Sequence, residues 1–380
     1  MTDSSSTTHS LVLNEAVYKS LSVDKKRRLY LYEWLMYLDK HLPSASKKEI
    51  KDSQQIIIAQ LLNFFNAFPG PPIRHLIAKN ISTLFSLGDL IALYGTIEKC
   101  NELLKSKEHE TQMQQMAKLS ALSVIGALYE KLGRMVPSYD ETVQILLKYL
   151  KSADSQVRIE IVQTFEKIIY GLGTAGQSLH KDIYKQLKQL VQDRVLAVRC
   201  ASIKCLCEMI KHSTFLYSPS SASASSSTAG ASSATSSVAH ELETNVQLGF
   251  KALDNSNYDV RCCVANYLAQ LVYYSINQLQ QQQLILQQQQ QMANASVLAP
   301  SSASGTNLAG MSGGGVDGST KQQREQAVQQ QQNVAAQMIM NEKIKNTLLL
   351  LSNGFSKLYS SSGSFNLGMM RILIFRVYYL

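Results

Sequence analysis

The chain has 380 residues, of which 45% are hydrophobic and 17% are charged, and its formal net charge is +9. This hydrophobic content can build a large core, so a chain that is disordered throughout is excluded. The sequence pI of about 9.1 is typical of nucleic-acid-binding proteins. The lysines are scattered singly over the expected helix faces, however, and this distribution does not favour a nucleic-acid footprint.

Residues 1–26 form a polar N-terminal segment. Met1–Ser10 is rich in Ser and Thr, unlike a secretion signal, and the chain has no apolar run of the roughly 18 residues that span a bilayer. We therefore expect a cytosolic protein. The basic run Lys25–Arg28 is interpreted as a solvated helix start, with contact to phosphate or an acidic membrane surface as the alternative.

An aromatic-rich helix follows at the start of residues 27–217, the main helical region. It contains Trp34, the only tryptophan of the chain, together with Tyr30, Tyr32 and Tyr37. These side chains pack either in the core of the terminal repeat or against a partner, because Trp and Tyr are favoured in binding hot spots. Trp34, Tyr30 and Tyr37 are therefore candidate docking residues.

A Val-Arg pair recurs at the head of three predicted helices. Arg158 and Arg199 are 41 residues apart, and Arg199 and Arg261 have the same separation once a Ser-rich tract of 21 residues is removed. Arg74 lies about two periods before Arg158, and a copy that has lost the pair is expected near Lys118. A period near 40 with two helices is typical of HEAT or armadillo repeats.

Each repeat contains a first helix, a polar turn and a second helix. The first helices are expected at Glu141–Lys151, Lys181–Val191 and Glu241–Leu253. Each helix has one apolar stripe that it cannot bury alone, so stacking is required. The sequence thus predicts an all-α fold, an α-solenoid with two low-complexity insertions.

The turn residues are assigned structural roles. Asp154 and Asp193 stand where a side chain can cap the free N–H groups of the second helix, and the Val is expected in the seam between helices. The Arg is expected to bond the aspartate or the carbonyls of the neighbouring turn, or else to lie over the apolar seam with its head in water. The repeat-structural candidates are Asp154, Val157, Arg158, Asp193, Val198, Arg199, Asp254, Val260, Arg261 and Arg74.

Two segments lack the apolar surface that would offset the entropy of ordering them. Residues 218–238 are a Ser-rich insertion, and residues 278–338 are a low-complexity segment rich in Gln, Gly and Ser; both are interpreted as mobile insertions between helices. Disorder is predicted for residues 218–238 and for about residues 293–323, and the Gln runs around Leu284–Leu286 are alternatively helical or a coiled-coil extension. Residues 239–277 form another repeat between them. Residues 339–380 are interpreted as a partial repeat with an atypical end.

No motif for catalysis, a cofactor or a metal is found. Gly171–Gly176 has the spacing G-x-G-x-x-G, but it follows a helix and not a strand, so we expect a helix end. His240-Glu241 begins like a zinc-protease helix, yet Thr244 stands where the second His is needed. The six cysteines lie in apolar helical patterns and lack the spacing of a zinc site. The sequence therefore favours a non-enzymatic binding scaffold.

Several segments resemble the N-terminal part of the HEAT repeat-containing protein five family. They span residues 9–277 and include His9–Glu15, Tyr32–Leu35, Leu38–Lys40, Pro69–Pro72 with Arg74, Ala78–Asn80, Tyr129–Met135, His180–Lys185, Asp193–Leu206 and Phe250–Arg261. The two insertions depart from the family pattern. The chain also ends at Arg371–Leu380 where the family continues, so we expect a fragment, a short isoform or a mispredicted gene end.

The resemblance implies a cytosolic scaffold that associates with aftiphilin, gamma-synergin and the clathrin adaptor AP-1. It implies a role in endocytosis and in endosome-to-Golgi transport, with indirect association to those membranes through partners and with no nucleic acid or small-molecule substrate. The repeats alone equally allow a solenoid of nuclear transport or of phosphatase regulation. An enzyme would require a convergent polar pocket, which no motif indicates.

Overall fold

The computed structural model describes residues 9–67, 70–106, 111–213, 216 and 232–297. These residues are helices joined by turns, with no strand among them, which confirms the predicted all-α class. They form two compact units. The first comprises the chain up to Ser213 together with Lys251–Tyr267, and the second comprises Thr214–Phe250 and the chain from Leu268.

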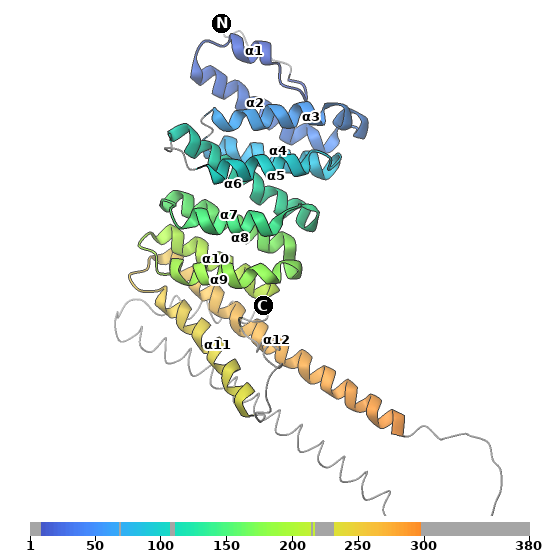
Figure 1. Cartoon of the computed structure of the whole chain (residues 1–380), viewed down its shortest axis with the longest axis vertical. Coiled ribbons are helices and arrows are strands. Elements are labelled where there is room, and N and C mark those ends of the chain that lie inside the picture. Colours follow the sequence, from blue (N-terminus) through green and yellow to red (C-terminus); the bar gives the residue numbers. More distant parts are fainter. Residues whose placement is uncertain (1–8, 68–69, 107–110, 214–215, 217–231, 298–380) are drawn as a thin grey trace, which may run out of the picture. The chain divides into compact units, whose positions relative to one another are not determined.

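Twelve α-helices are present in the described part of the chain (Figure 1). Their bounds are α1 Glu15–Ser20, α2 Asp24–His41, α3 Lys47–Asn63, α4 Pro71–Leu87, α5 Leu93–Lys105, α6 Gln112–Leu132, α7 Tyr139–Leu150, α8 Ser155–Leu172, α9 Gln177–Leu190, α10 Leu196–His212, α11 Ser232–Lys251 and α12 Tyr258–Val297. Short 3-10 turns follow α2, α3, α6 and α8.

Helices of the first unit pack in two layers. The even-numbered helices α2, α4, α6, α8 and α10 contact one another in that order, and α5, α7 and α9 do so on the other side. Each odd helix also packs on the even helix that follows it, as α3 does on α4 and α9 on α10. A helix pair is thus the repeating unit of this packing.

Even helices are apolar on more than one side because they contact neighbours in both directions. In α8 the buried side chains include Val157, Ile161, Phe165 and Ile169. The first-layer helix α9 buries only one stripe, which contains Leu179, Ile183 and Leu187. This difference follows from position, since no helix among the described residues covers the outer side of α9.

The N-terminal segment is more structured than its polar composition predicts. Leu11 and Leu13 are buried, and the Leu13 backbone exchanges two hydrogen bonds with the Gln60 side chain of α3, at 3.0 and 3.1 Å. The Trp34 indole N–H donates to the carbonyl of Ser10 at 3.2 Å. Residues 9–26 therefore pack against α2 and α3, because two leucines and two side-chain anchors tie the backbone down.

The Gly171–Gly176 stretch ends α8, as expected. Gly173 is the C-cap at φ 54°, and Gly173–Gly176 forms a 3-10 turn that leads into α9. Gly171 faces the carbonyl of Tyr129 so closely that a Cβ would lie 1.9 Å from its oxygen. The glycines therefore allow α6 and α8 to approach at their ends, and no strand precedes them within the described residues.

Both predicted insertions are partly helical. α11 begins at Ser232, so residues 232–238 belong to a helix and the Ser-rich insertion is shorter than predicted. α12 continues to Val297 through the first Gln runs, in line with the helical alternative and not with disorder. Long unbranched Gln side chains lose little freedom in a helix that has already been nucleated. Residues 217–231 and 298–380, including the expected partial repeat, lie outside the described residues.

Candidate binding groove

Arginines recur at equivalent helix positions. Arg74, Arg158, Arg199 and Arg261 are each the fourth residue of their helix, in α4, α8, α10 and α12 respectively. In α6 the fourth residue is Gln115, so the copy without the Val-Arg pair begins earlier than the predicted position at Lys118. A capping box formed by Thr111 and Gln114 sets this earlier start.

Asp154 and Asp193 each divide their two carboxylate oxygens between two turns. One Asp154 oxygen accepts from the Val157 N–H at 2.8 Å and caps α8, while the other accepts from the Gln115 side chain at 2.6 Å. One Asp193 oxygen accepts from the Val195 N–H at 2.8 Å, and the other lies 3.1 Å from the Arg158 guanidinium. Each aspartate therefore fixes its own turn and binds the preceding repeat.

These aspartates and the arginines Arg158 and Arg199 together link successive turns, and we call this set of contacts the polar ladder. The arginines contribute by donating hydrogen bonds to backbone carbonyls. Arg158 donates to the Ala153 carbonyl of its own turn at 3.0 Å. Arg199 donates to the Asp193 carbonyl of its own turn and to the Asp254 carbonyl of the next. The guanidinium groups thus lie in the turns and not over the apolar seam.

Of the two predicted caps, Asp154 and Asp193, only the second differs from expectation. The N-cap of α10 is Val195, without a side-chain cap, and Asp193 closes the turn before it. At α12 the cap is Asn257, whose side chain accepts from the Val260 N–H at 3.0 Å, while Asp254 contributes its carbonyl to the ladder. Val157, Val198 and Val260 are all buried in the seam.

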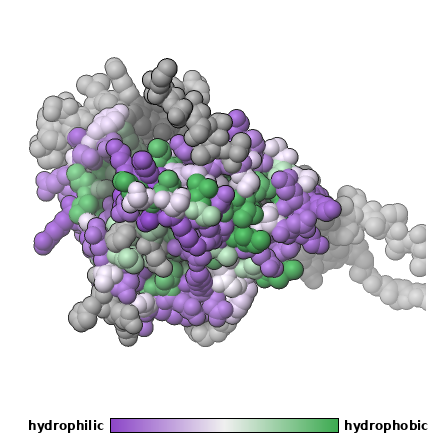
Figure 2. Space-filling view, turned by 90° about the horizontal axis from the view of Figure 1, so that it is seen from above, coloured by the Kyte–Doolittle hydropathy of each residue, from purple (hydrophilic) through white to green (hydrophobic). Residues whose placement is uncertain are grey.

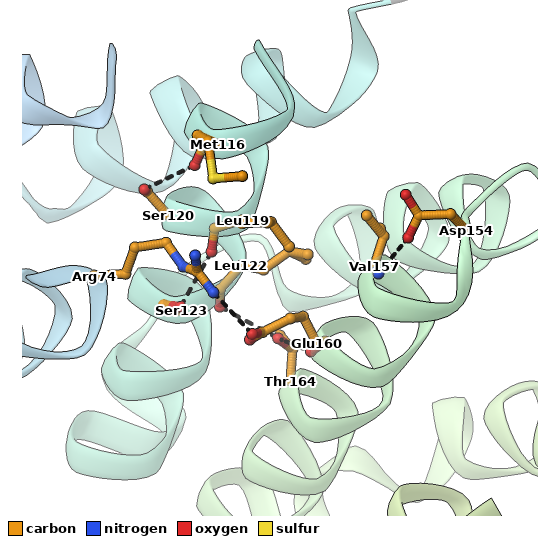
Figure 3. A network of polar contacts seen from close by, with 10 residues as sticks. All are labelled: Arg74, Met116, Leu119, Ser120, Leu122, Ser123, Asp154, Val157, Glu160 and Thr164. Carbon is orange, nitrogen blue, oxygen red and sulfur yellow. Dashed lines mark hydrogen bonds and ion pairs between the residues drawn. The ribbon is translucent and has the colours of Figure 1, made fainter. Parts of the chain in front are cut away.

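Arg74 makes a different contact from the other arginines. Its side chain is 2% exposed, and its guanidinium lies 3.0 Å from the Glu160 carboxylate of α8. Figure 3 shows this side chain reaching past α6, where Leu119 and Ser123 lie, to meet Glu160. Thr164 adds a hydrogen bond to the Leu122 carbonyl at 3.2 Å. The pair therefore joins α4 to α8 across the helix between them.

The aromatic candidates for docking are only partly accessible. Trp34 is fully buried among α2, α3 and the N-terminal segment, so its assignment as a docking residue is wrong. Tyr30 and Tyr37 are half-buried, and both contact the His9 ring. The centroid of the His9 ring lies 5.1 Å from that of Tyr30 and 6.0 Å from that of Tyr37. Tyr37 also stacks on His41. These residues hold the N-terminal segment in place.

A groove crosses the even-numbered helices of the first unit. Two hollows of about 740 and 460 Å³ adjoin, since both are lined by Glu130, Gln163 and Lys167. The smaller extends over α4 and α6, and the larger over α10 and the first turns of α12. We call the two hollows together the even-helix groove.

Both small side chains and longer charged ones line the even-helix groove. The small residues are Ala78, Ser82, Ser123, Ala127, Ala197, Cys200, Ala201 and Cys263. Lys167 pairs with Glu130 at 2.9 Å across α6 and α8, and Lys204 lies one helix further along. A surface of this kind accommodates side chains of a bound segment between charged groups that can contact its backbone or its ends.

Burial weakens the acidity of several groups in the groove. It raises the pKa of the Glu166 carboxyl, and the charge of Glu208 adds to that rise. It also raises the pKa of the Cys200 thiol to about 12, with the adjacent Cys263 thiol as a further cause. A thiol in this state is a poor nucleophile. Within the described residues, no cluster of His, Cys, Asp and Glu is arranged to hold a metal.

The groove residues were not predicted from the sequence, although the repeat register locates them. His75, Ile159 and Cys200 each follow the recurring arginine directly, and Lys79, Gln163 and Lys204 lie four residues further on. Aligning the second helices on their arginines would have found this shared face. The α6 contribution comes from further along its helix and does not follow the rule.

Comparison with known proteins gives a remote similarity. No family model matches the chain. Over 195 residues, 50% of the chain, it is 25% identical to Protein SWEETIE of Arabidopsis thaliana, and the match covers 9% of that protein. The chain therefore spans a small part of the length of this relative. No helix in the described part of the chain is both long and apolar enough to cross a membrane.

Proposed function

We propose that the chain is a non-enzymatic α-solenoid of HEAT-like repeats that binds segments of partner proteins. The observation that carries this proposal is the even-helix groove, which extends over five consecutive second-layer helices. A stack of helix pairs presents such a surface because every repeat contributes one face of its second helix. The recurrence of the ladder at successive turns supports the repeat assignment.

A helical or extended peptide segment is the partner that fits the groove best. The small residues leave room for side chains, and contacts from several helices add up over the length of a bound segment. Glu130, Glu166, Lys167 and Lys204 place both signs of charge along the groove. The charged pattern then selects among segments that fit the hollow sterically.

The cellular role proposed is that of an accessory protein in clathrin- and AP-1-linked trafficking. This part of the proposal rests on the resemblance of residues 9–277 to the HEAT repeat-containing protein five family. A solenoid of nuclear transport or phosphatase regulation would have the same groove, so the identity of the co-purified partners decides between the two assignments.

The test is affinity purification of the tagged full chain followed by mass spectrometry, with a groove variant beside it. Ala197 and Lys204 are exposed groove residues, so Ala197→Arg/Lys204→Glu changes shape and charge without touching the core. Lys148→Glu/Lys151→Glu, on exposed positions of α7 and its end, is the control outside the groove.

We expect adaptor subunits and aftiphilin-like proteins to co-purify with the unmodified chain and the control, and to fall at least about tenfold with the groove variant, which is about 1.4 kcal/mol of binding free energy. Retention of all partners by the groove variant would refute the binding role of the groove. Recovery of nuclear-transport or phosphatase subunits, lost with the same variant, would keep the groove and refute the trafficking role.

A further inference from the structure

The outward side of α2 carries exposed apolar residues in one row. Leu29, Tyr32 and Met36 are 57%, 39% and 43% exposed, and their spacing places them on one face of the helix. The opposite side of α2 is buried through Leu31, Trp34, Leu35 and Leu38. Figure 2, viewed from the end at which α1 lies in Figure 1, shows hydrophobic residues exposed among hydrophilic ones at that end. We call this row with its flanking residues the α2 face.

Basic residues surround the row without acidic partners. Lys25, Lys26, Arg28 and Lys40 are all exposed, and none forms an ion pair with a described residue. The run Lys25–Arg28 is the densest block of positive charge in the sequence.

Two of the nearby carboxylates, Asp24 and Asp39, pair with cations, and Glu33 approaches a histidine that is charged only when protonated, so the four unpaired basic residues outnumber it. Asp24 lies 3.8 Å from Arg27, Asp39 lies 2.7 Å from Lys79 of α4, and Glu33 lies 3.9 Å from the His9 ring. In α1, the Glu15 carboxylate binds Lys19 at 2.7 Å. The α2 face therefore carries a net positive charge that the acidic groups around it do not neutralise.

We propose that the α2 face binds the surface of an anionic phospholipid bilayer directly. Lys and Arg near an anionic leaflet are attracted to its negative surface potential. Leu29 and Met36 would enter the boundary between head groups and acyl chains, and Tyr32 would lie at head-group level, where its ring and hydroxyl each find a suitable environment. The flexible stems of the lysines reach the phosphates from either side of the row.

The shape of the α2 face favours a bilayer over a protein partner. It is one convex helix side about 25 Å long, by the rise of 1.5 Å per residue, with a single row of apolar side chains. A stable protein interface buries about 800 Å² on each partner, which a single row does not supply. A planar lipid surface needs only that the row penetrates while the flanking charges remain in water. This inference is independent of the even-helix groove, since no α2 residue lines it.

The experiment is sedimentation of the full chain with vesicles of phosphatidylcholine, with and without roughly one-third phosphatidylserine. Binding is expected only with phosphatidylserine and should decrease as salt screens the charges. Lys25→Glu/Lys26→Glu should lower the vesicle partition coefficient by at least about 20-fold, at about fivefold for each basic residue removed. Leu29→Ser/Met36→Ser should lower it while net charge is unchanged.

The control for charge is Lys47→Glu/Lys51→Glu at the start of α3, where both lysines are exposed and make no ion pair with a described residue. It changes net charge equally and should retain vesicle binding. Fluorescence of Trp34, which lies on the buried side of α2, checks that each variant folds. The milder variant Lys25→Gln/Lys26→Gln serves if the charge reversal disturbs that signal.

Three results would overturn the proposal. The first is that the unmodified chain fails to bind phosphatidylserine vesicles. The second is that both charge reversals weaken binding equally, which would indicate attraction by net charge alone. In the third case, the α2 variants would lose a co-purifying protein while vesicle binding stayed intact, which would make the α2 face a protein interface.

Discussion

At the residue scale, the ladder arginines each contact two turns at once. Arg199 bonds the carbonyl of Asp193 in its own turn and that of Asp254 in the next, and Arg158 does the same with Ala153 and the Asp193 carboxylate. The planar guanidinium has several N–H groups pointing in fixed directions, so one side chain can satisfy carbonyls of two turns. This geometry explains why the residue is Arg and not Lys in successive repeats.

Substitutions at the recurring pair should separate burial from bonding. Val198 is fully buried, so Val198→Asp places an unpaired carboxylate in the core and should lower the free energy of unfolding by several kcal/mol. Arg199→Lys keeps the charge but loses multiple bonding and should cost roughly 1 kcal/mol. Thermal unfolding and co-purification of partners are measured on both. Unchanged unfolding with loss of partners in Arg199→Lys would make Arg199 a binding residue.

The Arg74–Glu160 pair should behave as a buried pair does. Arg74→Met leaves the Glu160 carboxylate buried without its cation and should lower the free energy of unfolding by about 3–5 kcal/mol. The double variant Arg74→Met/Glu160→Leu removes both charges and should recover much of that loss. Denaturant unfolding of the single and double variants gives the coupling energy. Additive losses would show that the pair does not couple α4 to α8.

His180 should make the fold sensitive to mild acid. Burial lowers the pKa of its imidazole to about 4, helped by nearby His212, whereas an unfolded histidine titrates near 6.5. Between these values the unfolded chain binds a proton that the folded chain does not. Stability should therefore decrease as pH falls from about 6.5 to about 4, by a total on the order of 3 kcal/mol.

The raised pKa of Glu166 acts in the opposite direction over part of this range, because its folded form takes up a proton more readily. The measurement is thus the difference in unfolding free energy between the unmodified chain and His180→Asn at several pH values. Asn can still bond the Ser213 hydroxyl that now contacts the imidazole. A difference that does not vary between pH 7 and pH 4 would contradict the assignment.

At the element scale, helix starts are set by caps more than by apolar patterns. The sequence located the second helix of each repeat through its apolar stripe, yet it placed the lost copy at Lys118 where α6 begins at Gln112. The apolar stripe does not mark the first turn, where a capping box starts the helix: the Thr111 side chain accepts from the Gln114 N–H, and the Gln114 side chain accepts from the Thr111 N–H. The apolar stripe likewise does not reveal that Asn257 caps α12, because the cap lies before the first turn.

Other element boundaries depend on contacts that a composition argument does not include. Leu11 and Leu13 look like isolated apolar residues in a polar segment, and their burial is fixed by Gln60, which is 47 residues away from Leu13. Low complexity likewise predicts disorder for residues 232–238 and mobility from residue 278, whereas α11 begins at Ser232 and α12 continues to Val297. Propensity within a helix already begun outweighs composition there.

Removal of the α8 cap should weaken both α8 and the ladder. Asp154→Ala loses the bond to the Val157 N–H and the bond from Gln115, and should cost about 1–2 kcal/mol. Asp140→Ala is the matched control, since Asp140 is exposed in the first turn of α7 without a cap bond. Urea unfolding compares the two. Equal losses would show that the capping bond contributes little.

At the scale of the whole molecule, the packing order of the first unit was accessible from the repeat period, and the even-helix groove was not. A period near 40 predicts that like helices are neighbours, as α4, α6, α8 and α10 are. Which face remains open depends on residue size at positions such as Ala127 and Ala201, where small side chains leave a hollow. Small residues are common on both buried and open faces, so their pattern carried no signal.

Deletions in the Ser-rich tract should show where the insertion ends. Deleting residues 218–231 removes only chain that precedes α11, and loop length changes closure entropy slowly, so the melting temperature should move by no more than a few degrees. Deleting residues 218–238 also shortens α11 and should lower the melting temperature more. Differential scanning calorimetry measures both. A large loss with the shorter deletion would show that residues 218–231 contribute structure.

The acceptors of the ladder also bear on how the sequence can change over time. Arg199 bonds main-chain oxygens at Asp193 and Asp254, and every amino acid carries that oxygen. The donor is therefore constrained to one residue type, while the partners are constrained only in backbone shape. As such chains diverge, the turn residues should be substituted well before the arginine is. A relationship between two distant members would then survive as a spacing of single residues, which a comparison weighted toward whole-segment identity underestimates.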